Sequence, residues 1–274
     1  METTSNLLDT DLDDILRTAL DGSGEELFVV NPSGATIEAF VRVATDYDGD
    51  LPTTKLLAEE RTLKDVLDDF IVASNAADLV DAGDLHLRTA EAPSDNSLLV
   101  TDDSVIALID AGTSVGGVVA DEADFVDATG DTYADRWADA EEYGLRTPAI
   151  SRVRQTLADE IGPDAERDFD NILDSLETAR GDGDGLDEVT ISLLVAAKNE
   201  ALLYDISKWG EDVGIASKAT FSRTKTKLED MGLIDTEKVP IDVGRPRLRL
   251  KLADERLTDA QNGQLATVAG SILN

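Results

Sequence analysis

The basic side chains that could bind a polyanion are concentrated in one stretch of the sequence. Residues 217–251 contain nine Lys and Arg residues against five Asp and Glu residues, a net charge of 9 − 5 = +4. The rest of the chain has 15 bases and 53 acids, a net charge of −38. A basic island in so acidic a chain is typical of a surface that meets a polyanion. A solvated or internally ion-paired patch is the alternative.

Most other chemistries lack the residues they need. The sequence has no cysteine, which excludes disulfides, thiolate nucleophiles, zinc fingers and iron–sulfur clusters. Its one histidine, His86, excludes a multi-histidine metal site and is interpreted as structural. There is no phosphate-binding G-x-x-x-x-G-K-[ST] or G-x-G-x-x-G motif. We therefore expect no catalytic site, metal or cofactor, and keep an enzyme built on the N-terminal part as an alternative.

The acidity of the whole chain indicates its surroundings. The 274 residues include 58 Asp and Glu and 24 Lys and Arg, a net charge of −34. The acids are dispersed, mostly Asp, and lysine is scarce, a composition that favours a hydrated surface at very high salt. We interpret this as adaptation to a salt-rich cytoplasm, and the composition resembles that of halophilic archaeal proteins; an acidic decoy or chaperone that binds basic partners is the alternative. No apolar run is long enough for a membrane span, so no membrane partner is expected.

Short apolar runs and helical patterns alternate in residues 1–146. We expect a mixed α/β domain with three layers, serving as a sensor or a dimerisation platform. Thr10 is interpreted as the cap of the first helix, and Thr62 with Asp65 as a capping box. The expected strands are 26–30, 53–58, 85–88, 97–101, 105–109 and 115–120, and the expected helices 7–20, 35–45, 62–81 and 125–143.

Residues 147–274 are predicted to be helical except for one hairpin. A connector, 147–185, contains helices 150–161 and 163–179 and ends in the Gly/Asp linker 181–185. Residues 186–252 follow as a third domain, and a tail, 253–274, is predicted to hold one helix from Leu257 to Leu273. The helices of 150–179 and the tail helix are candidates for a homodimer contact.

The third domain has the element order of a winged helix-turn-helix. Helices are expected at 188–200, 202–213 and 218–231, followed by strands 233–239 and 247–252. Ser217 is a natural N-cap for the third helix, and Gly232 ends it. The 3–4 spacing turns an apolar stripe of this helix inward: Phe221, Thr224, Leu228 and Met231.

The opposite face of the third helix is expected to enter the major groove of double-stranded DNA. Arg223 is suited to guanine, while lysines and hydroxyls suit phosphate. Lys225 is expected to pack its stem and extend its ammonium outward. The predicted DNA-binding residues are Lys218, Thr220, Ser222, Arg223, Lys225, Thr226 and Lys227 on the helix, with Arg245 and Arg247 on the wing. Since one winged helix reads a single half-site, a homodimer is expected. An adaptor that uses the winged helix for protein contacts is the alternative.

The stretch from Ser217 to Ile234 resembles the recognition helix of archaeal and bacterial winged-helix regulators, roughly S-x-A-T-x-S-R-x-x-x-x-L-E-x-x-G-L-I. An acidic mixed domain before such a winged helix is similar to the order in the haloarchaeal TrmB-suppressor (TbsP-like) family. The resemblance covers most of the chain, with its specific motifs in 186–252. It implies a transcription factor acting on central carbon metabolism genes.

A weaker signal lies between the first two predicted elements of the mixed domain. Asn31, Ser33 and Thr36 follow a strand and precede a helix, so their polar groups could hold an anion. An effector there, a sugar or phosphometabolite, is one interpretation. A plain turn with an N-cap is favoured over it.

Overall fold

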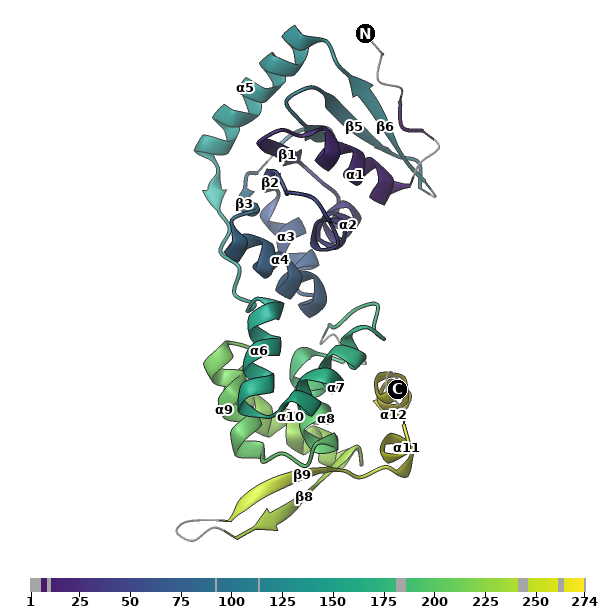
Figure 1. Ribbon diagram of the computed structural model, residues 1–274, viewed down its shortest axis with the longest axis vertical. Helices are drawn as coiled ribbons and strands as arrows, with labels where there is room; N and C mark the ends of the chain where they lie inside the picture. Colours follow the sequence, from purple (N-terminus) through teal and green to yellow (C-terminus); the bar gives the residue numbers. More distant parts are fainter. Residues whose placement is uncertain are drawn as a thin grey trace. The chain divides into compact units, whose positions relative to one another are not determined.

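The computed structural model describes residues 6–8, 11–91, 93–112, 114–180, 186–240, 246–260 and 264–273 (Figure 1). The chain forms two compact units. Unit 1 comprises Met1–Asp68 and Asn75–Leu145, and unit 2 comprises Asp69–Ser74 and Arg146–Asn274.

Unit 1 is built on a seven-stranded mixed sheet with the order β6-β5-β4-β1-β2-β3-β7. Strands β1, β2 and β3 are parallel, whereas β4, β5, β6 and the short β7 pair antiparallel with their neighbours. The strands are β1 (Glu26–Val30), β2 (Thr53–Ala58), β3 (Leu85–Thr89), β4 (Ser97–Val100), β5 (Val105–Asp110), β6 (Val115–Ala120) and β7 (Glu141–Glu142).

Helices cover both faces of this sheet, as the predicted three-layer fold requires. The connections from β1 to β2 and from β2 to β3 place α2 and the α3–α4 pair on one face (Figure 1), and Ile15 of α1 lies on that face beside Gly117. On the opposite face, α5 packs Val126 and Tyr133 against strand residues of β1, β4 and β5. The helices are α1 (Leu12–Gly22), α2 (Gly34–Thr45), α3 (Glu60–Val66), α4 (Phe70–Ala82) and α5 (Ala123–Asp139).

Unit 2 joins the predicted connector helices to the winged helix around one apolar core. Trp209 is fully buried in it, and its indole nitrogen donates a 2.9 Å hydrogen bond to the Thr156 hydroxyl of α6. The elements are α6 (Ile150–Glu160), α7 (Pro163–Leu173), α8 (Glu188–Lys198), α9 (Leu203–Val213), α10 (Lys218–Asp230), β8 (Ile234–Val239), β9 (Arg247–Leu252), α11 (Glu255–Thr258) and α12 (Gln264–Leu273).

The predicted first helix was wrong at its start. The helix begins at Leu12, because the Asp11 carboxylate accepts the backbone N–H of Asp14 and caps it. Leu7, predicted inside the helix, forms a β-bridge with Gly117 instead. Thr10, the expected cap, lies outside the described residues.

Of three other predicted helices, two are each divided in two and one ends early. The helix expected at 62–81 is divided into α3 and α4, because the Asp69 carboxylate accepts the backbone N–H of Ile71 and caps the start of α4. Thr62 lies inside α3, so no capping box forms there. The helix expected to reach Tyr143 ends at Asp139 and gives way to β7. The single tail helix is divided into α11 and α12.

The helix expected to reach Ala179 ends at Leu173. Beyond that point, Asp69 accepts the backbone N–H of Ala179 at 3.2 Å and pairs with Arg180, which ties this segment to the start of α4 within unit 2. Within the part of the chain described, no helix is both long enough and apolar enough to cross a membrane.

Candidate nucleic-acid interface

The helix-turn-helix consists of α9, a tight turn and α10. Gly214 ends α9 with φ +100°, a left-handed conformation that favours glycine. Ser217 then caps α10 by accepting the backbone N–H of Thr220 at 3.2 Å. Gly210 of α9 lies against the ring of Phe221, so closely that a Cβ there would overlap the ring. The two helices therefore cross at a point where only glycine fits.

The faces of α10 are divided as the 3–4 spacing predicts. Phe221 and Leu228 are buried, and Thr224 and Met231 are half-buried. Outward-facing positions are all exposed: Lys218, Ser222, Arg223, Thr226 and Lys227. Thr220 and Lys225 are half-buried on the flanks. No acidic residue occurs from Val213 to Leu228, although 58 of the 274 residues are acidic, so α10 presents its free side without a carboxylate before Glu229.

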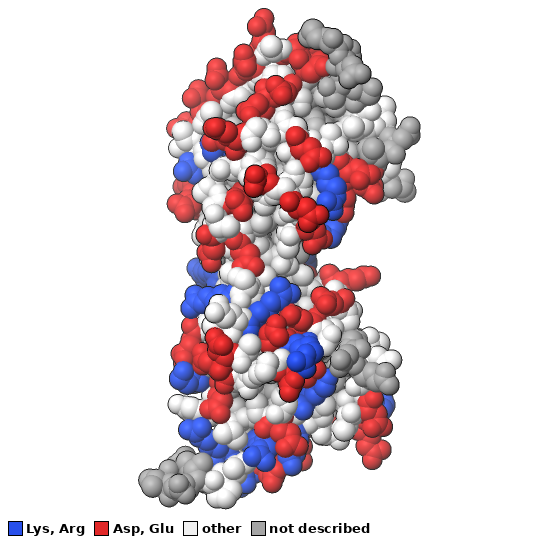
Figure 2. Space-filling view, in the orientation of Figure 1, with Lys and Arg blue, Asp and Glu red and all other residues white. Residues whose placement is uncertain are grey.

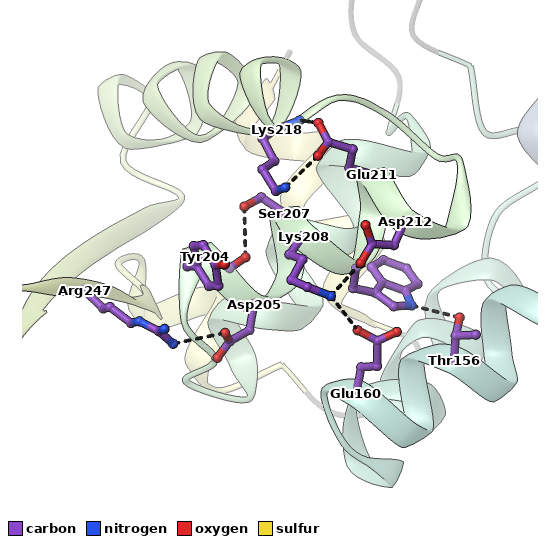
Figure 3. Close-up of polar contacts among 11 residues, drawn as sticks. Thr156, Glu160, Tyr204, Asp205, Ser207, Lys208, Glu211, Asp212, Lys218 and Arg247 are labelled. Atoms are coloured by element: carbon purple, nitrogen blue, oxygen red, sulfur yellow. Dashed lines mark hydrogen bonds and ion pairs between the residues drawn. The ribbon is translucent and has the colours of Figure 1, made fainter. Parts of the chain in front are cut away.

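Two lysines of α10 are paired with carboxylates. The Lys218 ammonium lies 2.6 Å from Glu211 of α9 (Figure 3). Through this hydrogen bond Lys218 lowers the pKa of the Glu211 carboxyl, and Glu211 raises the pKa of Lys218. Lys225 differs from expectation, because its ammonium turns back to Glu229 at 2.6 Å and only 12% of its side chain is exposed. Glu229 also accepts the Thr236 hydroxyl at 2.9 Å, which links α10 to β8.

Four other bases make no ion pair among the described residues. Arg223 has only a long hydrogen bond of 3.4 Å to the Thr220 hydroxyl, on its own helix. Lys227 is exposed on the same side of α10. Lys238 and Arg249 lie on β8 and β9, where they pair in register with Leu248 and Glu237. Neither strand residue was predicted as a contact; their membership of the basic island was the signal that could have suggested them.

The wing strands pair antiparallel from Ile234–Leu252 to Val239–Arg247. Arg247 stacks its guanidinium over the Tyr204 ring, 4.5 Å from the ring centroid, and lies 3.3 Å from an Asp205 oxygen (Figure 3). These contacts from the start of α9 orient Arg247 at the end of the wing strands that borders the hairpin loop. Arg245, predicted at the tip, lies outside the described residues, as does Gly244.

The predicted effector residues Asn31, Ser33 and Thr36 make hydrogen bonds within unit 1. Asn31 donates from its amide to the Ser94 carbonyl at 3.0 Å. Ser33 caps α2 by accepting the Thr36 N–H at 3.1 Å, and Thr36 is buried. An open cleft of about 1120 Å³ lies elsewhere in unit 1, beyond the carboxyl ends of β2 and β3. Charged side chains dominate its lining: Glu59, Glu60, Arg61, Glu91, Arg136, Asp139 and Glu141.

Two other predicted features concern catalysis and metals. His86 is exposed on β3 and is therefore not a core residue. The described residues contain no group of three or more His, Asp or Glu side chains placed to hold a metal ion.

The charges of unit 2 differ from those of unit 1 on the visible face. On this face Lys and Arg are interspersed with Asp and Glu over unit 2, whereas most of the charged side chains seen on unit 1 are Asp and Glu (Figure 2). By sequence, unit 1 has 33 acids and 7 bases, a net charge of −26, and unit 2 has 25 acids and 17 bases, a net charge of −8.

Comparison with known proteins gives a family for both parts of the chain. Residues 4–148 match the N-terminal domain of TbsP-like transcriptional regulators, and residues 149–270 match their C-terminal helix-turn-helix domain. No curated protein matches the chain. A solved structure described as TrmBL2, an archaeal chromatin protein with a novel mode of DNA binding, is 16% identical with a TM-score of 0.36. The match covers 51% of this chain and 52% of that one, so the chain spans about half the length of that structure. With both family matches together spanning nearly all its residues, the chain belongs to the TbsP-like transcriptional regulators.

Proposed function

We propose that the chain is a sequence-specific regulator that reads double-stranded DNA with the outward face of α10. The observation that carries this proposal is the acid-free side of α10, on which Arg223 and Lys227 are exposed and without ion pairs among the described residues. In a chain of net charge −34, carboxylates would occupy such a face unless a polyanion had to approach it.

The contacts divide by chemistry. Arg223 is placed to form a bidentate contact with guanine, while Ser222, Thr226 and Lys227 suit phosphate oxygens. Tyr204 and Asp205 hold Arg247 in place. We expect Arg247 and Arg245 to contact the DNA phosphate backbone beside the wing. Lys225 supports the helix through Glu229 and does not touch DNA directly.

The Arg223→Ala variant tests this proposal. Loss of a bidentate guanine contact should weaken specific binding by about 1–3 kcal/mol and relax the preference at one base pair. The measurement is a titration of labelled operator, found by selection from random duplexes, against a scrambled duplex. Arg152→Ala is a matched control, because Arg152 is an exposed arginine of α6 with no ion pair among the described residues. Equal operator affinity of Arg223→Ala and wild type would contradict the assignment of this face.

The setting of this activity is also a proposal. We infer a homodimer that binds paired half-sites, controls metabolic genes and works in the salt-rich cytoplasm of a halophilic archaeon. The dispersed acids and scarce lysines support the salt adaptation. Because molar salt weakens phosphate contacts through counterion release, base contacts should provide more of the specificity than usual.

We further propose that unit 1 binds a small-molecule effector, a sugar or phosphometabolite, in the cleft beyond β2 and β3. Ligands of α/β sheets bind beyond the carboxyl ends of parallel strands, and Asn31 follows β1 at this same edge. Arg61 and Arg136 could bind a phosphate, and the surrounding carboxylates could accept sugar hydroxyls.

A melting-temperature screen with sugars and sugar phosphates tests the effector proposal. A ligand of the cleft should raise the melting temperature of wild type but shift Arg61→Ala less, since the Arg61 side chain is 90% exposed and its loss should not disturb folding. Arg17→Ala, an exposed arginine of α1, is the control. An unchanged melting temperature across the screen would count against an effector of this class.

A further inference from the structure

In the described part of unit 1, one helix, α5, covers one face of the sheet and crosses it diagonally. Alternate strand residues Phe28, Val30, Val100 and Val105 point to this face and pack against Val126 and Tyr133 of α5. The helix starts just after β6, at one edge of the sheet, and ends beside β7, at the other edge (Figure 1). A diagonal helix leaves two opposite corners of the face uncovered.

The first of these, the polar corner, consists of Glu26, Lys55 and His86. Lys55 and His86 are in register with Phe28 and therefore lie on the same face. The Lys55 ammonium lies 2.6 Å from Glu26, and His86 is exposed. This corner has the side chains expected of a sheet surface that faces water.

The second, the apolar corner, consists of Leu8, Ala107, Ile109, Val118 and Phe125. Ala107 and Ile109 follow Val105 at every second position of β5 and so lie on the same face of the sheet, and Ala107 pairs in register with Val118. Ile109 is 52% exposed and Val118 40% exposed. Leu8, 60% exposed, belongs to the same face, because a Cβ on Gly116, the register partner of Ile109, would lie 3.3 Å from Leu8 Cδ2.

Phe125 faces this corner from the first turn of α5. It lies eleven residues, or three turns, before Arg136 and so shares a flank of the helix with it. Arg136 donates from Nη1 to the Pro93 carbonyl at 2.5 Å, just before β4. The start of β4 pairs with the end of β5, where Ile109 lies. The flank that carries Phe125, 52% exposed, is thus turned toward the apolar corner.

The apolar corner departs sharply from the composition around it. Residues 104–120 contain one charged side chain, Asp110, within a unit of 33 acids and 7 bases. Five large apolar side chains are prominently exposed among the described residues, and four of them are here. The fifth, Tyr204, is stacked by Arg247 in unit 2. A contiguous exposed apolar patch of this kind is a mark of a covered surface.

We propose that two copies of the chain associate through their apolar corners about a two-fold axis. Two units of net charge −26 can approach closely only over a surface without charge. In a two-fold contact the same patch meets itself, and an apolar patch is complementary to its own copy. A nucleic acid or a basic protein would instead be drawn to charged faces. The need for two copies rests on the proposed reading of paired half-sites.

The helices that the sequence suggests for this contact, those of residues 150–179 and of the tail, place buried apolar residues in the core of unit 2. Leu265 and Ala269 of α12, and Phe169 and Ile172 of α7, belong to the core of unit 2. Exposed positions of α12 are polar: Gln264, Thr267 and Ser271. The unit 1 corner therefore offers the contact that these helices do not.

Light scattering on the full chain at about 2 M KCl, where surface charges are screened within less than ~3 Å, tests the proposal. Wild type should have twice the 29.3 kDa chain mass, and Val118→Glu should have the mass of one chain. His86→Glu, the same charge change in the polar corner, should keep the doubled mass. Circular dichroism melts establish that each variant is folded. A wild type of single mass, whether or not another protein binds the corner, or a Val118→Glu variant of doubled mass overturns the proposal.

A cysteine pair covers the case in which Val118→Glu does not fold. Because the chain has no cysteine, Val118→Cys introduces a single thiol. A short bismaleimide should link two copies of Val118→Cys but leave His86→Cys unlinked on a denaturing gel. Linkage of both variants, or of neither, contradicts the proposed contact.

DNA titrations separate this proposal from the proposed function. Val118→Glu should bind a single half-site as wild type does and lose at least tenfold on paired half-sites. If wild type binds neither duplex, the DNA-reading proposal fails while the masses still decide the dimer. If both proteins bind paired half-sites equally, the apolar corner is not the contact.

Discussion

Unit 1 and unit 2 share one acidic background but interrupt it in opposite ways. Unit 1 interrupts it by omitting charge, over the apolar corner on β5 and β6. Unit 2 interrupts it by supplying bases, over α10 and the wing. In a chain whose surface is otherwise carboxylate, each interruption needs a compensating contact. Departures from the average composition, more than the average itself, therefore indicate where partners bind.

The largest effect is expected from breaking the core beneath α10. Phe221 is fully buried against Gly210, so Phe221→Ala should cost unit 2 about 3–5 kcal/mol of its free energy of unfolding. Each unit has one tryptophan, Trp137 or Trp209. Denaturant titrations of Trp137→Phe, with and without Phe221→Ala, follow unit 2 through Trp209. Exposed Ser222→Ala is the control; a similar loss from both changes would contradict the burial argument.

The second largest effect is expected from salt, which should stabilise the two units to different extents. Screening relieves repulsion in proportion to like charge, so unit 1, at −26, should gain more stability than unit 2, at −8, between ~0.1 M and ~2 M KCl. Melts of the two single-tryptophan variants, Trp209→Phe for unit 1 and Trp137→Phe for unit 2, measure this difference. A flat or falling melting temperature in both would refute the salt adaptation, and a larger gain in unit 2 would refute the comparison.

A smaller effect should follow from freeing one base of α10. Glu211→Gln removes the charged partner of Lys218 and should strengthen DNA binding by less than about 1.4 kcal/mol, while steepening the salt dependence by about one unit. Glu255→Gln makes the same charge change at a residue of α11 that itself forms no ion pair among the described residues. DNA-binding titrations of both variants over a series of salt concentrations measure the affinity and its salt dependence. An unchanged slope for Glu211→Gln would mean that Lys218 does not contact phosphate.

The smallest effect concerns pH. Lys251 lowers the pKa of Glu237 through a hydrogen bond across the wing. A carboxyl whose folded pKa is depressed stabilises the fold above its unfolded value, near 4.5, and loses that contribution as pH falls through the folded pKa. Glu237→Gln should therefore narrow the stability difference between pH 6 and pH 3 slightly, since the pair is exposed. Melts over that range measure it; a wider difference in the variant would give the wrong sign.

Much of unit 2 could be predicted from sequence because its signals are local. Ser217, the Phe221–Leu228 spacing and Gly232 lie within sixteen residues and define α10 by capping and periodicity alone. The six longer strands of unit 1 were also predicted nearly to the residue, since each is a short apolar run between turns. Breaks such as Asp69 were missed, because a carboxylate that caps a new helix resembles one on a helix surface.

The sequence by itself determined the acidic background, the basic island and the faces of α10, since these depend on composition and on spacing within one helix. Only the tertiary structure decided which bases keep partners, because the carboxylates come from other elements: Glu211 for Lys218, and Asp205, 42 residues away, for Arg247. It also decided which apolar strand residues stay uncovered. Val105 and Ile109 lie on the same face of β5. The diagonal course of α5 buries Val105 and leaves Ile109 exposed.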